Sequence, residues 1–137
     1  MNLPSLIAVP ITFALLVTVL RIMGRPWRCP CKGGQVFSPG EEHYSMHLFD
    51  AWSVSHFGHG MFFYAAFRGF LVERSWFLSV ALAVAFEAVW EVIENTPYVI
   101  GVYRRSGDRL YRGDSVINSV GDVLACLAGA LTVGMFV

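Results

Sequence analysis

Apolar residues are gathered in four long stretches, and the segments between them carry most of the charge. The hydrocarbon core of a bilayer is about 30 Å thick and takes about 20 helical residues to cross. The pattern therefore predicts an all-α fold, a four-transmembrane-helix bundle formed as a single integral membrane domain over 1–137. The expected helices cover about 3–23, 48–71, 76–100 and 115–137.

Two connecting segments differ in character from the stretches around them. The segment 24–47 contains Cys, Gly, Pro and charged residues and is expected to form a small cytoplasmic cap between the first two helices. The segment 101–114 is polar and basic, and we expect a turn with Gly107 and Asp108 at its tip. In the last stretch, small residues predict close helix contact: Gly121, Ala125, Ala128, Gly129 and Gly134.

The basic residues predict the orientation of the helices. Eight of the ten lie in or beside the segments 24–47 and 101–114, and the other two, Arg68 and Arg74, flank the turn between the second and third stretches. Cytoplasmic loops carry an excess of Lys and Arg. Both termini are therefore expected on the periplasmic side of a bacterial inner membrane.

Composition supports a membrane location and excludes some partners. Hydrophobic residues make up 55% of the chain, and the mean hydropathy is +0.55. The lipid bilayer is thus the expected partner, whereas a formal net charge of zero gives no reason to expect nucleic acid. The first 23 residues lack a basic start and a small-residue cleavage site, which favours a retained helix over a signal peptide.

Three carboxylates interrupt the third stretch. Glu87, Glu91 and Glu94 are spaced by four and then three residues, so they share one face of a helix. One carboxylate in the bilayer centre costs about 2.5 kcal/mol or more on insertion scales. This face must therefore meet protein, water, protons or a cation.

Other stretches place polar residues at a similar depth. At about 1.5 Å per residue, His56, Glu94, Glu91 and Asp122 all lie about 9–13 Å from the same end of the bundle. We predict a divalent metal, Zn, Mn or Fe, with ligands His56, His59, Glu91, Glu94 and Asp122. Glu91 and Asp122 are the catalytic candidates. The secondary candidates are Asp50, Glu87, Asp114, Asn118, Cys29, Cys31 and His47.

A purely structural alternative remains open for this cluster. Interhelical hydrogen bonds between His, Glu, Asn and Asp stabilise membrane bundles by about 0.6–2 kcal/mol each. The excess of carboxylates over histidines favours a site, because two imidazoles cannot neutralise four acids. Glu87 is the weakest member, because it lies deepest.

Two further groups lie in the connecting segments. Cys29-Pro-Cys31 followed by His43 and His47 approaches a zinc-ligand spacing, although the two cysteines are one residue closer than usual. The alternative is a tight turn without metal. The basic residues of the later segment are candidates for binding an anionic lipid or a lipid-linked phosphate: Arg104, Arg105, Arg109 and Arg112.

Five motifs resemble those of a known family. They are Gly-Arg-Pro-Trp-x-Cys-x-Cys at 24–31, His-x-x-Asp at 47–50, His-x-x-His-Gly at 56–60, Trp-Glu-Val-Ile-Glu-Asn-x-Pro at 90–97 and Gly-Asp-Ser-Val-Ile-Asn-Ser-Val-Gly-Asp at 113–122. In these the chain resembles a family of short uncharacterised bacterial inner-membrane proteins with a domain of unknown function. The resemblance implies a four-helix membrane protein and assigns no activity.

The residues leave three functions open. In the first, the metal site hydrolyses or transfers a lipid-linked substrate. In the second, the same groups carry a metal or protons without catalysis. In the third, the chain is an accessory subunit whose polar face pairs with a larger membrane complex.

Overall fold

The computed structural model describes residues 3–31, 36–38, 40–70 and 76–136, and this part of the chain is all-α. The four long helices are α1 (Leu3–Ile22), α2 (Ser53–Phe70), α3 (Trp76–Glu94) and α5 (Val116–Gly134). A shorter helix, α4 (Pro97–Ser106), and a 3-10 turn, η1 (Glu41–His43), lie in the connecting segments. The expected helix ends at Leu71 and Val137 lie outside the described residues.

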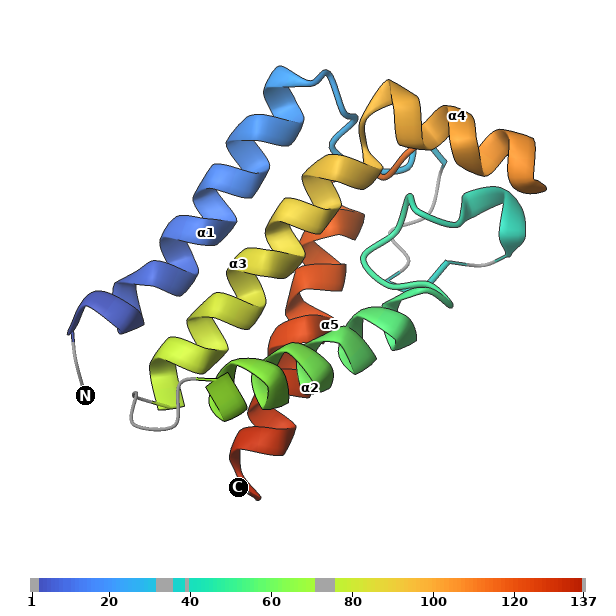
Figure 1. Cartoon of the computed structure of the whole chain (residues 1–137). Coiled ribbons are helices and arrows are strands. Elements are labelled where there is room, and N and C mark those ends of the chain that lie inside the picture. Colours follow the sequence, from blue (N-terminus) through green and yellow to red (C-terminus); the bar gives the residue numbers. More distant parts are fainter. Residues whose placement is uncertain (1–2, 32–35, 39, 71–75, 137) are drawn as a thin grey trace.

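Helix α3 is the centre of the bundle. It packs against α1 on one side and against α2 and α5 on the other, while α2 and α5 make the most extensive contact of all. Both chain ends lie at the end of the bundle opposite α4 (Figure 1). The apolar core is built from all four long helices: Leu16, Leu20, Tyr64, Val80, Ala83, Val84, Ala88, Val116, Val123 and Ala130.

Two predictions about helix limits are wrong. The third helix ends at Glu94 rather than near residue 100, because the residue before a proline disfavours helical geometry and Pro97 starts a new helix instead. Thr96 caps that helix by accepting a hydrogen bond from the Val99 amide. Residues 101–106 of the segment expected to be a turn belong to α4, which projects away from the long helices (Figure 1). The expected turn at Gly107 and Asp108 follows directly after this helix. Helix α2 starts at Ser53, five residues later than expected.

The long helices differ in whether their length and hydropathy suit a membrane span. Within the described residues, α3 and α5 are long and apolar enough to cross a membrane, and α1 has a shorter apolar segment over Ile7–Ile22. Helix α2 does not qualify, since its sequence includes two histidines, two serines and an arginine. Length and composition thus identify two membrane-capable helices among the described residues and do not establish four spans.

Glycines bring the α2 and α5 backbones together. A Cβ added to Gly60 on α2 would collide with the Cys126 carbonyl oxygen, and one added to Gly129 on α5 would collide with that of Phe57. Such close approach is the usual packing mode of small residues between membrane helices. The seam fixes the height of α2 relative to α5.

A buried amide closes the junction of α3, α4 and α5. The Asn95 side chain donates to Asp114 Oδ2 at 2.8 Å and accepts from the Asp114 amide at 2.8 Å. It also donates to the Glu91 carbonyl at 2.9 Å, one turn back on α3. The three bonds fix the start of α5 against the end of α3.

Gly60→Ala is expected to lower the free energy of unfolding by about 1–3 kcal/mol, because the methyl group would force α2 and α5 apart. Thermal denaturation of the detergent-solubilised protein, followed by circular dichroism, measures the change. The matched control is Gly58→Ala, whose Cβ meets nothing within 4 Å and should leave stability equal or slightly higher. Equal loss in both variants would contradict the close seam.

Asn95→Ala is expected to destabilise the fold by about 1–3 kcal/mol, because it leaves the buried Asp114 amide without its acceptor. The same denaturation measurement applies. Ser106→Ala on the neighbouring α4 removes an exposed hydroxyl that bonds only locally to the Tyr103 carbonyl, and it should change little. A stability of Asn95→Ala equal to that of the control would show that the junction does not depend on the amide.

Candidate functional site

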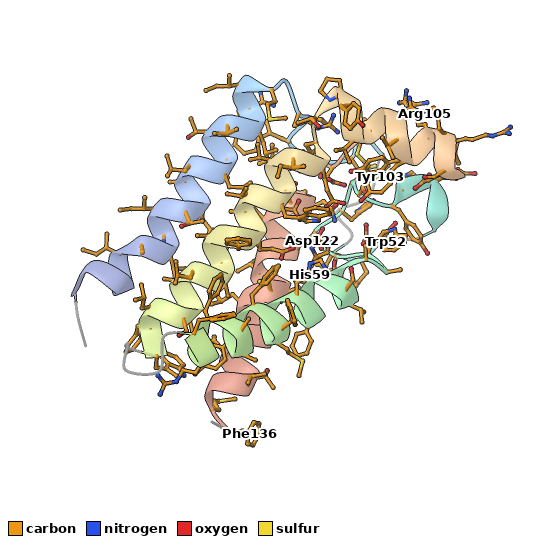
Figure 2. The ribbon with its side chains drawn as sticks, in the orientation of Figure 1. Trp52, His59, Tyr103, Arg105, Asp122 and Phe136 are labelled. Atoms are coloured by element: carbon orange, nitrogen blue, oxygen red, sulfur yellow. The ribbon has the colours of Figure 1, made fainter. Side chains whose placement is uncertain are left out.

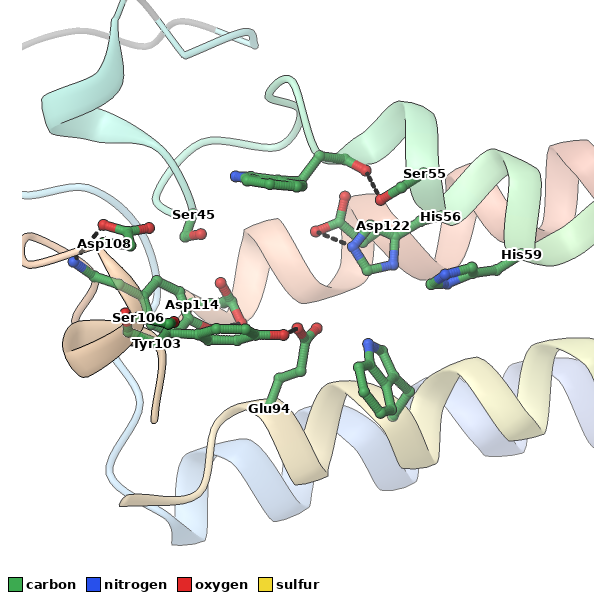
Figure 3. A pocket seen from close by; sticks show the side chains of 13 residues that line it. Ser45, Ser55, His56, His59, Glu94, Tyr103, Ser106, Asp108, Asp114 and Asp122 are labelled. Atoms are coloured by element: carbon green, nitrogen blue, oxygen red, sulfur yellow. Dashed lines mark hydrogen bonds and ion pairs between the residues drawn. The ribbon is translucent and has the colours of Figure 1, made fainter. Parts of the chain in front are cut away.

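Acidic and imidazole side chains from α2, α3 and α5 converge inside the bundle, at the end that carries α4. On α2, His56 and His59 are three residues apart, which places both rings on the side that faces α3. Figure 3 shows these two rings near Asp122 of α5 and across from Glu94 of α3. The periodicity of each helix thus supplies one polar face, and packing brings the faces together.

His56 is the hub of the cluster. Its Nδ1 atom is in hydrogen-bonding contact with Glu87 Oε1 and lies 3.5 Å from Glu91 Oε1. Its Nε2 atom lies 3.8 Å from Asp122 Oδ2. His59 Nδ1 lies 3.3 Å from the Glu87 carboxylate. One ring therefore faces carboxylates from two different helices.

Glu91 has one ion-pair partner in the described part of the chain, His56 Nδ1 at 3.5 Å, and that nitrogen already contacts Glu87. Glu91 is 1% exposed, and neither of its oxygens has a hydrogen-bond partner among the described residues. Within that same part of the chain, the ion pairs of the core acids are all to histidine. Burying an uncompensated carboxylate is costly, so Glu91 is the group that most requires a cation or a proton.

Neighbouring hydroxyls position two other acids. Ser53 Oγ donates to Asp122 Oδ1 at 2.6 Å, and Tyr103 OH donates to Glu94 Oε1 at 2.6 Å. Tyr103 comes from α4, so this short helix reaches back to the cluster. These contacts leave the remaining carboxylate oxygens oriented toward the core.

Asp114 belongs to the junction rather than to the cluster. Besides Asn95, it accepts a hydrogen bond from Tyr111 OH at 3.0 Å, and Arg25 donates to its backbone carbonyl at 2.8 Å. Burial raises the pKa of the Asp114 carboxyl, although hydrogen bonds from Tyr111 and Asn95 favour its charged form. Burial and the nearby Asp114 also raise the pKa of Tyr111, so the phenol stays a donor.

A cavity of about 410 Å³ opens beside the cluster. Figure 2 shows Trp52, His59, Tyr103 and Asp122 together in the space between α4 and α2. The cavity lining combines aromatic, hydroxyl and ionisable groups: Ser45, Trp52, Ser55, His56, His59, Trp90, Glu94, Tyr103, Ser106, Asp108, Tyr111, Asp114 and Asp122. The volume suits a small molecule or the headgroup of a larger one.

Two sets of three ligand atoms lie close enough to share one ion. Atoms of His56, His59 and Glu87 lie within 4.8 Å of one another, as do atoms of His56, Glu91 and Glu94. Asp122, a predicted ligand, is in neither set. Mixed imidazole and carboxylate donors suit Zn, Mn or Fe better than Mg or Ca.

Several predicted site residues lie elsewhere. Asp50 accepts from the amides of Ser45 and Trp52, so it holds the turn that precedes α2. Asn118 donates to the His47 carbonyl and thereby ties α5 to the connecting segment. Cys29, Cys31 and His47 form a separate group with His43.

The arginines proposed to hold an anion do not line the cavity. Because the segment folds into α4, Arg104 and Arg105 lie on an exposed helix, and Figure 2 shows Arg105 pointing away from the cluster. Arg109 and Arg112 are exposed as well. An anion-binding role for these four residues has no support from their placement.

Sequence reasoning undervalued Glu87 and missed two tyrosines. Glu87 contacts both histidines, and its place on the shared face of α3 was the available signal. Tyr103 and Tyr111 lie beyond the proline break, so periodicity along α3 gave no indication that they return to the site.

Comparison with known proteins identifies relatives over most of the chain. A family described as "Protein of unknown function (DUF2585)" matches residues 20–136. A UPF0314 protein of Sphingopyxis alaskensis is 39% identical over 124 residues, covering 88% of this chain and 66% of the relative. UPF0314 proteins of Rhizobium meliloti and Sinorhizobium fredii are 40% and 41% identical, each covering 86% of this chain and 61% of the relative.

The chain therefore spans slightly less than two thirds of the length of these relatives. No solved structure matches it. The match covers α2 to α5 and the segment with the two cysteines, and so includes every residue of the cluster. The chain belongs to the DUF2585 family of bacterial UPF0314 proteins.

Proposed function

We propose that this protein is a four-span inner-membrane protein that binds a divalent transition metal at the His56 cluster and uses it to hydrolyse or transfer a lipid-linked substrate. The single observation that carries the proposal is Glu91, a fully buried carboxylate without a hydrogen-bond partner beside an imidazole that already contacts Glu87. A bound cation would supply the charge that this arrangement lacks.

Exposed apolar side chains support four spans. Large apolar residues lie on the outer surface of α1 and α2 as well as of the two more apolar helices; on α1 and α2 they include Ile11, Leu15, Met61, Phe62 and Phe70. An apolar surface of this extent on a single chain indicates a lipid or protein environment. The polar residues that lower the hydropathy of α2, His56 and Ser53 among them, are buried against α3 and α5.

The distribution of charge supports the proposed orientation. Both termini lie at one end of the bundle, and the segments that carry eight of the ten basic residues lie at the other (Figure 1). The positive-inside rule then places α4 and the cluster near the cytoplasmic face, with both termini periplasmic.

Different side chains of the cluster would bind the ion, orient a ligand and accept a proton. His56 offers a donor atom together with either His59 and Glu87 or Glu91 and Glu94, and Tyr103 fixes the orientation of Glu94. When bound, the cation would act as a Lewis acid toward an ester or phosphate oxygen and toward water. Glu91 has both oxygens free of hydrogen bonds and is placed to take up a proton.

The cavity favours chemistry over passage across the membrane. It is lined at the α4 end by Trp52, Tyr103 and Ser106 together with the cluster. Among the described residues of the opposite half, the buried polar groups are the hydroxyls of Tyr64 and Ser79. A path for protons or ions would need polar groups on both sides of the cluster. A site open toward one face instead suits a lipid headgroup.

The proposal predicts that purified protein contains a transition metal in the cluster. His56→Ala and Glu91→Gln are each expected to lower the metal-to-protein ratio by about one equivalent, because each removes a charge or ligand from the same ion. Inductively coupled plasma mass spectrometry of the detergent-purified variants measures the ratio.

Ser55→Ala is the matched control, since this hydroxyl lines the same cavity but donates to the Trp52 carbonyl rather than to the cluster. The ratio should stay at the wild-type value in this variant. An unchanged metal-to-protein ratio in both His56→Ala and Glu91→Gln would show that the cluster binds no metal. Interhelical pairing would then be the role of the cluster.

Tyr103→Phe tests whether α4 helps to hold the ion. Loss of the hydroxyl leaves Glu94 without its donor, so metal affinity should fall by about 10-fold or more while the fold is retained. Competition with a chromogenic chelator gives the affinity, and Tyr98→Phe on the same helix, an exposed tyrosine, is the control. Equal affinities for the two variants would exclude Glu94 as an oriented ligand.

A further inference from the structure

A second group of metal-ligand side chains lies outside the bundle, in the segment between α1 and α2. It draws Cys29 and Cys31 from one limb of that segment and His43 and His47 from the other, 12 or more residues later. One atom of each lies within 4.8 Å of the other three. Cys29 and His47 are buried, and the other two are half-buried.

The distances within the group match the edges of a tetrahedron around zinc. With Zn–S about 2.3 Å and Zn–N about 2.0–2.1 Å, a tetrahedral site has S···N edges of about 3.5 Å. Cys29 Sγ lies 3.3 Å from His43 Nδ1, and Cys31 Sγ lies 3.4 Å from His47 Nε2. Each thiol thus points at its own imidazole, and both are free cysteines rather than a disulfide.

Hydrogen bonds around the group hold the ligands in place. The Cys31 amide donates to Cys29 Sγ at 3.3 Å, which fixes the position of that sulfur. The Cys29 amide donates to the Met46 carbonyl at 3.0 Å and so joins the two limbs next to the ligands. The two imidazoles meet edge to face, with ring centroids 5.9 Å apart.

Regular secondary structure is sparse in this segment. Between α1 and α2, the described residues form one 3-10 turn and an isolated bridge between Phe37 and Phe49. Several of its large apolar side chains are exposed, including Trp27, Val36 and Phe37. A small unit that lacks a hydrophobic core commonly needs a metal or a disulfide to hold it together.

We propose that Cys29, Cys31, His43 and His47 bind one zinc ion as a closed, tetrahedral structural site. All four positions around the ion are filled by protein, which is typical of structural rather than catalytic zinc. The ion is separate from the metal of the His56 cluster and does not depend on it.

The zinc site would set the position of α5. The limb that carries the cysteines supplies the carbonyls of Pro26 and Trp27, which accept from the amides of Val116 and Ile117 at 2.8 and 3.1 Å. The limb that carries the histidines supplies the Ser45 carbonyl, which accepts from the Ser115 amide at 2.7 Å. Joining the limbs therefore holds the first turn of the helix that carries Asp122.

The zinc content of variants that lack one or two of these ligands tests the proposal. His43→Ala and the double variant Cys29→Ser/Cys31→Ser should each lose one zinc per chain relative to the wild type, measured on protein purified in detergent. Cys126→Ser is the matched control, because the third cysteine is buried in the α2–α5 seam away from the group and contacts the Ala83 carbonyl. It should keep the full zinc content.

His43→Cys separates loss of a ligand from loss of the fold. Three cysteines and one histidine also form a structural zinc site, so this variant should keep the zinc that His43→Ala loses. Cobalt-loaded wild-type protein should also show a thiolate-to-cobalt charge-transfer band. That band should persist in His56→Ala and disappear in the double cysteine variant, which distinguishes this site from the cluster in the bundle.

Zinc content that is unchanged in both His43→Ala and the double cysteine variant would overturn the proposal. So would a cobalt-loaded wild type without the charge-transfer band. Loss of zinc from the loop variants together with full metal content in His56→Ala would support this site and reject the cluster metal, so that the two proposals fail independently.

Discussion

The fold depends on burying two carboxylates of α3, with a third, Glu94, half-buried beside them. Glu87 is fully buried and Glu91 is 1% exposed, and such groups are tolerated only where partners meet them. His56 and His59 supply imidazoles from α2, and Ser53 on the same helix holds Asp122 of α5. The relative placement of α2, α3 and α5 is thus tied to these polar contacts as much as to apolar packing.

Close backbone contact makes this placement possible. Because Gly60 and Gly129 let α2 and α5 touch, His56 is brought level with Asp122 and across from Glu91. The break at Asn95 and Pro97 has a second effect, since it turns the chain into α4 and returns Tyr103 to Glu94. Backbone features that lie outside the cluster therefore decide its geometry.

Hydrogen bonds join the segment between α1 and α2 to the start of α5 in the bundle. Carbonyls of Pro26, Trp27 and Ser45 accept the first amides of α5, and the Asn118 side chain donates to the His47 carbonyl. A change in that segment would move the helix that carries Asp122. The two proposed metal sites share no ligand, but both lie next to α5.

The motifs pointed to an uncharacterised bacterial family, and the sequence also determined the all-α class and the shared polar faces of the helices. Local periodicity is enough for the class and the faces, because the spacing of Glu87, Glu91 and Glu94 and of His56 and His59 fixes which side chains lie together on one helix. Periodicity cannot say which faces meet. It therefore could not show that Glu87 contacts both histidines or that Tyr103 reaches Glu94.

Only the tertiary structure decided how the basic segment and the cysteine segment fold. Pro97 and its cap start a helix that turns Arg105 outward, and the turn expected at Gly107 and Asp108 comes only at the end of this helix. The spacing of Cys29, Cys31, His43 and His47 already suggested a zinc-ligand group, and the tertiary structure adds that the two limbs meet where they pack on the start of α5. Such meetings depend on distances between elements, and spacing along one chain does not contain that information.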